Sequence, residues 1–180
     1  KYQNDFAQAY RLYTLALANS ADIASMNRLR EMSTSMVSNA ARARLAAAYA
    51  LAGQKKVAES LFSKVKLDSE EDDYFSYGST LRNQAMGLET ALLLGKAELA
   101  ADLALEISDR LSSSEWLSTQ TTAYSLYAMA RYVAKNKTGK NWTLNYQLGK
   151  ESATLSNSPS GYASKVLSAS LGNHKIALQN

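Results

Sequence analysis

The sequence predicts a mainly α-helical chain, built of antiparallel helical hairpins and followed by a short β-rich segment. Three observations predict this class. The 180 residues include one proline and eight glycines, so few residues interrupt a helix. Hydrophobic residues make up 46% of the chain, which is enough for a packed core. Apolar residues recur at helical spacing as far as Lys135 and at alternate positions from Trp142 onward.

The first hairpin is expected to join helices over 5–18 and 22–32. Asp5 suits the start of the first helix, where an acidic side chain is favourable. Its predicted inward stripe recurs at intervals of four and three: Phe6, Tyr10, Tyr13 and Leu17. The second helix is expected to turn Ile23, Met26 and Leu29 inward.

The second hairpin is expected over 39–51 and 54–66. Gly53 ends its first helix, as glycine commonly does. A short link makes neighbouring helices antiparallel. The predicted inward residues are Leu45, Ala48, Tyr49 and Ala52 on the first helix, and Val57, Ala58, Leu61, Phe62 and Val65 on the second.

Residues 67–80 interrupt the helical pattern. Five acidic residues between Asp68 and Asp73 are too dense to be buried, and Tyr74, Phe75 and Tyr77 follow. We expect an exposed acidic loop that leads into a docked aromatic segment. A divalent-cation site is the alternative, but the spacing lacks the glycine and terminal glutamate of a calcium loop.

Three further helices are expected over 81–94, 97–111 and from Ser118 or Thr119 to Lys135. Gly95 ends the first of them. The predicted inward residues are Leu81, Ala85, Leu88 and Leu92; then Leu99, Ala100, Leu103, Ala104, Ile107 and Leu111; then Ala123, Leu126, Tyr127, Ala130 and Ala134.

The hairpins repeat along the chain. Gly53 and Gly95 lie 42 residues apart, and Ala58 and Ala100 keep the same offset. A looser copy lies upstream, where Asn19 takes the place of the glycine at an offset of 34. Stacked hairpins that bury their faces on their neighbours are the expected architecture.

The remainder of the chain is expected to be rich in β-structure. Apolar and polar residues alternate from Trp142 to Leu148, which is a strand pattern. A turn is expected over 157–161 and a short strand over 175–179, while 162–171 fit either state. We therefore divide the chain into helical hairpins over 1–138 and a β-rich tail over 139–180, which is expected to lead into a neighbouring β-domain.

Charge and composition exclude several kinds of function. The net charge of +4 comes from scattered basic residues, which predicts a solvated surface and no nucleic-acid binding. The absence of cysteine excludes disulfides, thiol catalysis and thiolate metal sites within the chain. No apolar run approaches the roughly 20 residues that cross a bilayer, so no membrane contact is expected. Because the first residue is Lys1, we expect the chain to be part of a longer protein.

No residue pattern indicates catalysis. His174 is the single histidine and lies in a polar turn sequence, so a catalytic triad or zinc site would lack partners. Thr119, Thr121 and Thr122 suit a helix start, where hydroxyls cap the backbone. Most of the eleven tyrosines are expected to pack in the core with their hydroxyls at its rim. The sequence thus predicts no catalytic, cofactor-binding or metal-binding residue, no cofactor, and no enzyme.

Several segments resemble, in order, the bacterial α2-macroglobulin-like proteins. These segments begin at Tyr10, Met26, Leu45 and Tyr77, and they end with Ile176–Asn180. The most specific is Trp116-Leu-Ser-Thr-Gln-Thr-Thr-Ala-Tyr124, which resembles the start of the last toroid helix in that family.

The resemblance implies part of an α/α-toroid, the thioester-type domain of large secreted or periplasmic protease-trapping proteins. Its partners would be other domains of the parent chain and, through the parent, target proteases. Because this chain has no cysteine, any thioester would lie upstream, and no thioester residue is assigned. The location implied is periplasmic or extracellular.

Two other classes compete with this one. A tetratricopeptide-like module that binds partner proteins would explain 45–62, but the 34-residue offset is not sustained and a β-rich tail has no place in such an array. A toroid glycosidase or cyclase would need clustered catalytic acids, which the sequence does not offer.

Overall fold

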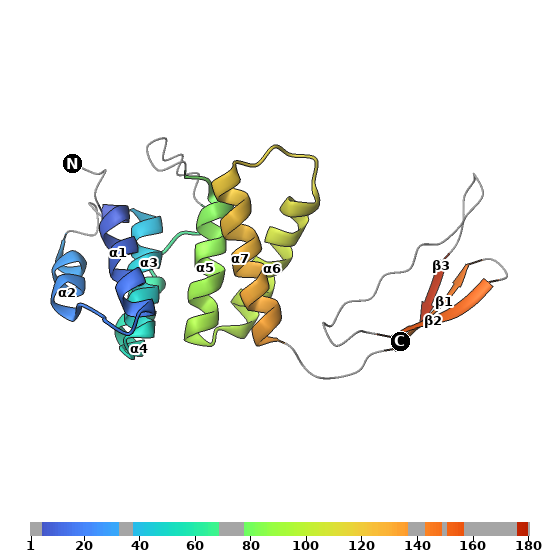
Figure 1. Ribbon diagram of the computed structural model, residues 1–180, viewed down its shortest axis with the longest axis horizontal. Coiled ribbons are helices and arrows are strands. Elements are labelled where there is room, and N and C mark those ends of the chain that lie inside the picture. The colour runs from blue at the N-terminus through green and yellow to red at the C-terminus, as the bar shows by residue number, and fades with distance from the viewer. Residues whose placement is uncertain are drawn as a thin grey trace. The chain divides into compact units, whose positions relative to one another are not determined.

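The computed structural model describes residues 5–32, 38–68, 78–136, 143–148, 151–156 and 176–179 (Figure 1). The chain forms two compact units, Lys1–Lys135 and Asn136–Asn180. The helices of the first unit are α1 (Asp5–Leu17), α2 (Ile23–Glu31), α3 (Asn39–Leu51), α4 (Lys55–Phe62), α5 (Thr80–Leu94), α6 (Ala97–Ser112) and α7 (Thr119–Lys135). The strands of the second are β1 (Thr143–Leu148), β2 (Glu151–Ser156) and β3 (Ile176–Gln179).

The predicted fold class is confirmed, and most helix bounds agree within two residues. The exception is α4, which ends four residues before its predicted end. Two side chains of α3 bond to the backbone just after α4. Arg42 donates to the carbonyl of Lys64 at 3.1 Å, and Asn39 accepts from the amide of Lys66 at 3.1 Å. The carbonyl of Lys64 and the amide of Lys66 thus bond to side chains of α3, where a longer α4 would have bonded them within the helix. Either kind of partner satisfies a backbone polar group.

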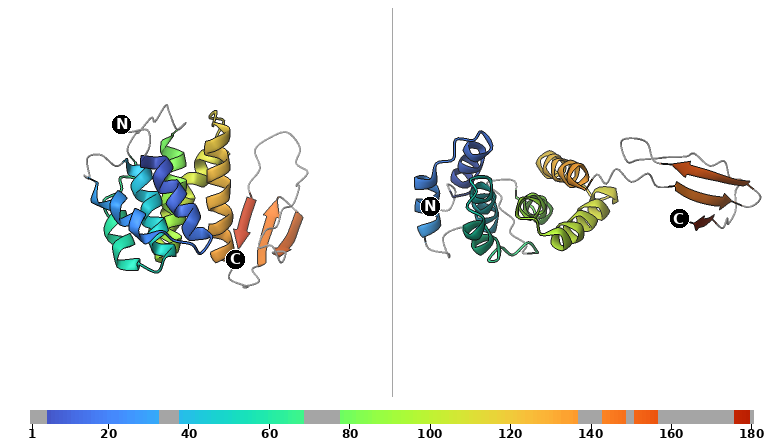
Figure 2. Two further views of the ribbon diagram at one scale, coloured as in Figure 1. Left: turned by 60° about the vertical axis from the view of Figure 1, so that its left-hand side comes forward. Right: turned by 90° about the horizontal axis from the view of Figure 1, so that it is seen from below.

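The helical unit has two layers. The odd-numbered helices α1, α3, α5 and α7 pack each against the next, and α2, α4 and α6 pack against the outer side of this row. Seen from below, the odd-numbered helices form an arc with the even-numbered ones outside it (Figure 2). We call the odd-numbered helices the inner arc.

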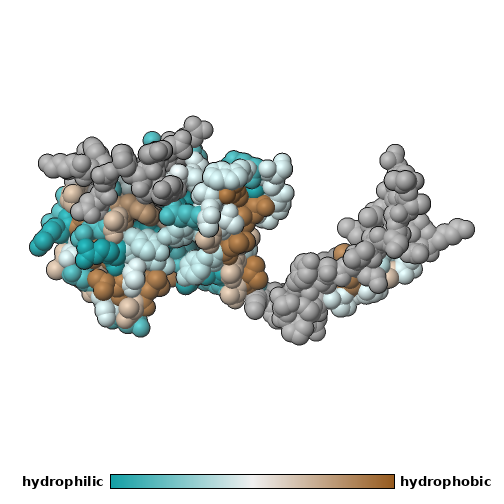
Figure 3. Space-filling view, turned by 45° about the horizontal axis from the view of Figure 1, so that its top comes forward, coloured by the Kyte–Doolittle hydropathy of each residue, from teal (hydrophilic) through white to brown (hydrophobic). Residues whose placement is uncertain are grey.

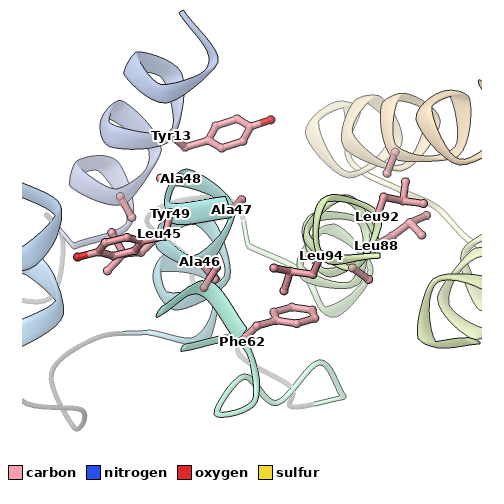
Figure 4. Close-up of a cluster of buried hydrophobic side chains, with 14 of the residues drawn as sticks. Tyr13, Leu45, Ala46, Ala47, Ala48, Tyr49, Phe62, Leu88, Leu92 and Leu94 are labelled. Atoms are coloured by element: carbon pink, nitrogen blue, oxygen red, sulfur yellow. The ribbon is translucent and has the colours of Figure 1, made fainter. Parts of the chain in front are cut away.

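The two central helices of the arc are buried on nearly all sides. In α5, 13 of 15 residues are buried, and α3 is buried without a break from Ala43 to Tyr49. The alanines of α3 have small side chains that let its neighbours approach closely. Phe62 of α4 and Leu94 of α5 face each other beneath them, while Leu88 and Leu92 lie on the side of α5 away from α3 (Figure 4). All four side chains belong to one hydrophobic core.

The ends of α1, α3 and α5 share one backbone motif. Asn19, Gly53 and Gly95 have positive φ angles of 56°, 76° and 73°. The amide of the next residue then reaches back five positions, from Ser20 to Leu15, Gln54 to Tyr49 and Lys96 to Ala91. This is the Schellman ending of a helix. The predicted correspondence between Asn19 and the two glycines is therefore confirmed.

Three of the inner helices also begin with a serine N-cap. The side chains of Ser38, Ser79 and Ser118 accept hydrogen bonds from the amides of Ala41, Arg82 and Thr121. A serine in this position satisfies an amide that has no partner within the helix. Short hydroxyl caps and left-handed ends thus define the length of the inner helices.

The predicted inward face of α7 is wrong, and those of α1 and α2 are wrong in part. On α1, Tyr13 is buried as predicted, but Leu17 is 40% exposed and the other buried residues each lie one position before a predicted one. On α2, Met26 and Leu29 are buried as predicted, whereas Ile23 is 37% exposed. On α7 the whole predicted stripe is exposed, and Thr121, Ser125 and Ala128 are buried instead. Small side chains let α7 lie close to α5, so its larger apolar residues face outward. In Figure 3 such apolar patches interrupt the hydrophilic surface of the helical unit.

The second unit holds a three-stranded antiparallel sheet in the order β2-β1-β3. The predicted alternation in β1 is confirmed, because Tyr146 is buried while Asn145 and Gln147 are exposed. Strand β2 was not predicted individually. Its exposed serines and threonine give only a weak apolar alternation. The turn expected over 157–161 and the segment 162–171 lie outside the described residues.

Candidate functional site

The concave side of the inner arc contains a groove of about 210 Å³. Its walls come from α1 and α7, and its floor from α3 and α5. The lining residues are Tyr10, Tyr13, Leu17, Arg44, Glu89, Ala123, Tyr124 and Tyr127. We call it the tyrosine groove. Tyr10 and Leu17 of the predicted α1 stripe therefore line a groove, whereas the sequence predicted that they would lie in the core.

A buried ion pair forms the floor. Arg44 of α3 donates to Glu89 of α5 at 2.5 Å, and each side chain is 2% exposed. Tyr13 donates its hydroxyl to the other carboxylate oxygen. Taking two charges out of water costs several kcal/mol per ion, which their attraction offsets only in good geometry. The two hydrogen bonds, one on each carboxylate oxygen of Glu89, help to offset this cost.

Tyrosine rings surround the guanidinium of Arg44. Its central carbon lies 4.5 Å from the ring centre of Tyr13 and 5.6 Å from those of Tyr10 and Tyr124. A cation above an aromatic face is attracted by the ring quadrupole, and the attraction grows where water is excluded. The rings of Tyr10 and Tyr124 also meet edge-on at 6.3 Å. Through these contacts Arg44 joins α1, α3, α5 and α7.

Two tyrosines of the groove, Tyr13 and Tyr124, are held in their protonated form. Burial, reinforced by the hydrogen bond to Glu89, raises the pKa of Tyr13 well above its ordinary value. Burial and the hydrogen bond with Tyr10 raise the pKa of Tyr124 in the same direction. A protonated phenol is a hydrogen-bond donor but a weak nucleophile or base at neutral pH. The hydroxyls of Tyr13 and Tyr124 are thus suited to binding and to structural hydrogen bonds.

Arg131 of α7 lies at the edge of the groove. Its guanidinium is 3.8 Å from Glu89 and donates to the Tyr127 hydroxyl at 2.8 Å. Partial burial alone would lower the pKa of Arg131, but this hydrogen bond and the charge of Glu89 outweigh it and raise the pKa. With one carboxylate and two guanidinium groups, the groove carries a local excess of positive charge.

A second polar cluster joins the beginnings of α5 and α7. Arg82 is 1% exposed and donates to Gln120 at 3.1 Å, and its guanidinium lies 4.8 Å above the ring of Phe6. Ser79 and Thr121 share a hydrogen bond of 2.8 Å. The cluster connects α1, α5 and α7 at the end of the arc where these helices start.

The residues that the sequence offered as functional candidates lie in different parts of the chain. Ser118 caps α7, as expected, by accepting from the amide of Thr121, and Thr121 is 2% exposed. His174 and most of the acidic loop lie outside the described residues. Tyr13 departs from the expectation for tyrosines, because its hydroxyl lies inside the unit on Glu89 and not at the rim.

The buried charges were not predicted from the sequence. A usable signal exists, since Glu89 is the one charge between Asn83 and Leu94, and Arg44 lies in an alanine-rich run. A lone charge on a helix that is apolar all round must find a buried partner. Which helix supplies that partner depends on the tertiary arrangement.

Within the described ranges, no three or more His, Cys, Asp or Glu residues are grouped to hold a metal ion. None of the helices described is both long and apolar enough to cross a membrane. Comparison with protein-family models, curated proteins and solved structures found no match.

Proposed function

We propose that the helical unit is a non-enzymatic scaffold domain, part of an α/α-toroid, in a macroglobulin-like protein that traps proteases. The observation that carries the proposal is the hydrogen bond between Arg82 and Gln120. It joins two of the segments that carry the resemblance to that family, the one that ends at Arg82 and the more specific one from Trp116 to Tyr124. The protein would act in the periplasm or outside the cell.

The arrangement of the helices supports the toroid. The inner helices lie in an arc with the others outside it (Figure 2), which is how part of a ring of paired helices would look. The short links at Gly53 and Gly95 pair α3 with α4 and α5 with α6, an inner helix with an outer one each time. The β-strand unit that follows suits a chain that passes from the toroid into a β-domain.

The chemistry of the tyrosine groove supports a structural role. Both carboxylate oxygens of Glu89 are occupied, and Tyr13 and Tyr124 are held protonated. Arg44 and Arg82 are each 1% exposed and are bonded to neighbouring helices. Such networks favour one arrangement of helices, and in this one Arg44 Nε is buried without a hydrogen-bond partner among the described residues.

A protease-protection assay on the macroglobulin-like parent protein that the proposal implies tests it. Trypsin is mixed with the protein, and its activity is then measured on a small peptide substrate and on casein. Trapped trypsin should keep its activity on the small peptide in the presence of soybean trypsin inhibitor, and lose activity on casein. If the inhibitor blocks both activities as it does for free trypsin, the proposal is wrong.

The second candidate is a tetratricopeptide-like module that binds partner proteins. The tyrosine groove favours it, because a concave face lined by aromatic and charged side chains is typical of such modules. An experimental structure of the longer protein separates the two. Helices that close into two concentric rings support the toroid, and an open superhelix supports the module.

A further inference from the structure

A second groove lies on the outer layer, between α2 and α4. It has a volume of about 400 Å³, and its floor includes Leu45 of α3. The other apolar residues that line it are Leu29, Met32, Val57 and Leu61. We call it the basic groove, because four cationic residues line it together with these apolar ones: Arg30, Arg42, Lys56 and Lys64.

The charge of this groove is one-sided. No acidic residue is among the described residues that line it. The groove between α4 and α6 provides a contrast, because its lining mixes Lys66 and Lys96 with Asp68, Asp102 and Glu106. The sequence suggested that basic residues are scattered over a solvated surface. The fold instead gathers four of them around one apolar floor, a combination that attracts an anionic partner with apolar parts.

The cations are spread along the groove. Lys56 lies in the first turn of α4 and Lys64 lies two residues beyond its end, so they stand at opposite ends of a helix roughly 12 Å long. Arg30 is on α2, at the other side. A fatty acid or a single phosphate carries its charge at one point and would reach only part of this set. A partner with several separated acidic groups matches it.

The residues of the groove floor favour a peptide over a nucleic acid as the partner. Proteins that bind single strands without sequence preference stack bases on exposed aromatic rings. The lining of the basic groove contains only aliphatic and methionine side chains as its apolar part. Tyr49 lies under Arg30 but is 1% exposed, and the Arg30 guanidinium, 5.8 Å from its ring centre, covers it. The groove therefore suits apolar amino-acid side chains better than bases.

From these observations we propose that the basic groove binds an acidic peptide segment of a partner protein. One or two apolar side chains of the peptide pack on Leu45 and its neighbours, and carboxylates of the peptide pair with Arg30, Lys56 and Lys64. Arg42 has a structural role, because it donates to the Lys64 carbonyl at 3.1 Å and so positions one end of the groove. Because these pairs are exposed, binding should weaken as salt rises.

A binding measurement with defined peptides tests the proposal on the 180-residue chain. The probe is a fluorescein-labelled, capped nonapeptide that alternates Glu and Asp with Leu and Phe, followed by fluorescence anisotropy. We expect saturable binding that weakens as NaCl is raised from 50 to 300 mM, in the direction that screening dictates. Replacing the acidic residues of the peptide by Lys, or its apolar residues by Ser, should abolish the binding.

Variants of the chain locate the site. Lys56→Glu/Lys64→Glu should weaken binding by about tenfold or more, an expectation based on the loss and reversal of two charges. Lys96→Glu is the matched control in the neighbouring groove and should bind like the unaltered chain. Circular dichroism verifies that each variant is folded, and both altered lysines are exposed.

Three results would overturn the proposal. These are absence of peptide binding at 50 mM NaCl, equal binding by the double variant and the unaltered chain, and tighter binding of a labelled oligo-dT of nine nucleotides than of the acidic peptide. The trypsin assay above does not depend on this groove, so the two proposals can fail separately.

Discussion

Arg44 of α3 and Glu89 of α5 form an ion pair of 2.5 Å in which each side chain is 2% exposed. Tyr13 of α1 donates to the same carboxylate, and Arg131 of α7 lies 3.8 Å from it. All four helices of the inner arc therefore contribute to one polar network, whose members on α1, α3 and α5 are buried. Since the loss of one partner leaves the other charged and buried, we take this network as the feature that holds the arc in a single arrangement.

Alkaline pH should weaken the helical unit. Burial and the bond to Glu89 raise the pKa of Tyr13 above its ordinary value of 10.0, so the folded state favours the protonated phenol. This contribution to stability is complete below pH 10 and is lost as the pH rises above it. Urea unfolding followed by circular dichroism at 222 nm should show a falling free energy of unfolding between pH 9.5 and 11.

Tyr13→Phe is the control for that measurement. It should be less stable than the unaltered chain at pH 8, because Glu89 loses a hydrogen-bond donor, by about 1 to 2 kcal/mol. Its stability should also fall less steeply above pH 10. Equal slopes for the two proteins would contradict the assignment of the raised pKa to Tyr13.

The left-handed helix ends should tolerate glycine better than alanine. A Cβ at Gly53 or Gly95 would meet nothing within 4 Å, but the φ angles are +76° and +73°. Gly53→Ala and Gly95→Ala should each cost about 1 kcal/mol through backbone conformation alone. Asn19→Gly relieves the same conformation and should be neutral or slightly stabilising. Thermal unfolding would refute this account if Asn19→Gly lost as much stability as the two alanine variants.

The serine cap of α7 should contribute measurably. Ser118 accepts from the amide of Thr121 at 3.1 Å, so Ser118→Ala should lower the free energy of unfolding by about 1 kcal/mol. Ser118→Asp keeps an acceptor at the same place and adds a charge that the helix start favours, so it should recover most of the loss. An aspartate variant no more stable than the alanine variant would argue against capping.

The helices could be predicted from sequence because their signals are local. Gly53, Gly95 and Asn19 mark the ends of helices, and apolar spacing marks the lengths between them. The faces were harder to predict. On α7 the sequence favours Leu126 and Tyr127 as inward residues, yet both are exposed, because the small residues Ser125 and Ala128 allow a closer approach to α5.

The site could not be predicted because it depends on contacts between distant segments. Arg44 and Glu89 are 45 residues apart, and nothing in either segment specifies the other. The basic groove has the same origin, since Arg30 and Lys64 come from different hairpins. Local patterns indicated which residues are helical, while the curvature of the arc decided which charges meet.

A double-mutant cycle on Arg44 and Glu89 tests most directly the claim that one buried pair holds the inner arc together. Urea unfolding at 222 nm would compare the unaltered chain with Arg44→Met, Glu89→Leu and the double variant. Each single variant should lose about 3 to 5 kcal/mol, because each leaves an uncompensated buried charge. The double variant should be more stable than the sum of the two losses predicts, by about 1 kcal/mol or more.

Arg131→Met is the matched control in this experiment. Its side chain is 40% exposed, so its loss should be about 1 kcal/mol or less. Strong coupling between Arg44 and Glu89, together with a small effect at Arg131, is the result that the account predicts. Losses at Arg44 and Glu89 that simply add, or that are no larger than the loss at Arg131, would contradict it.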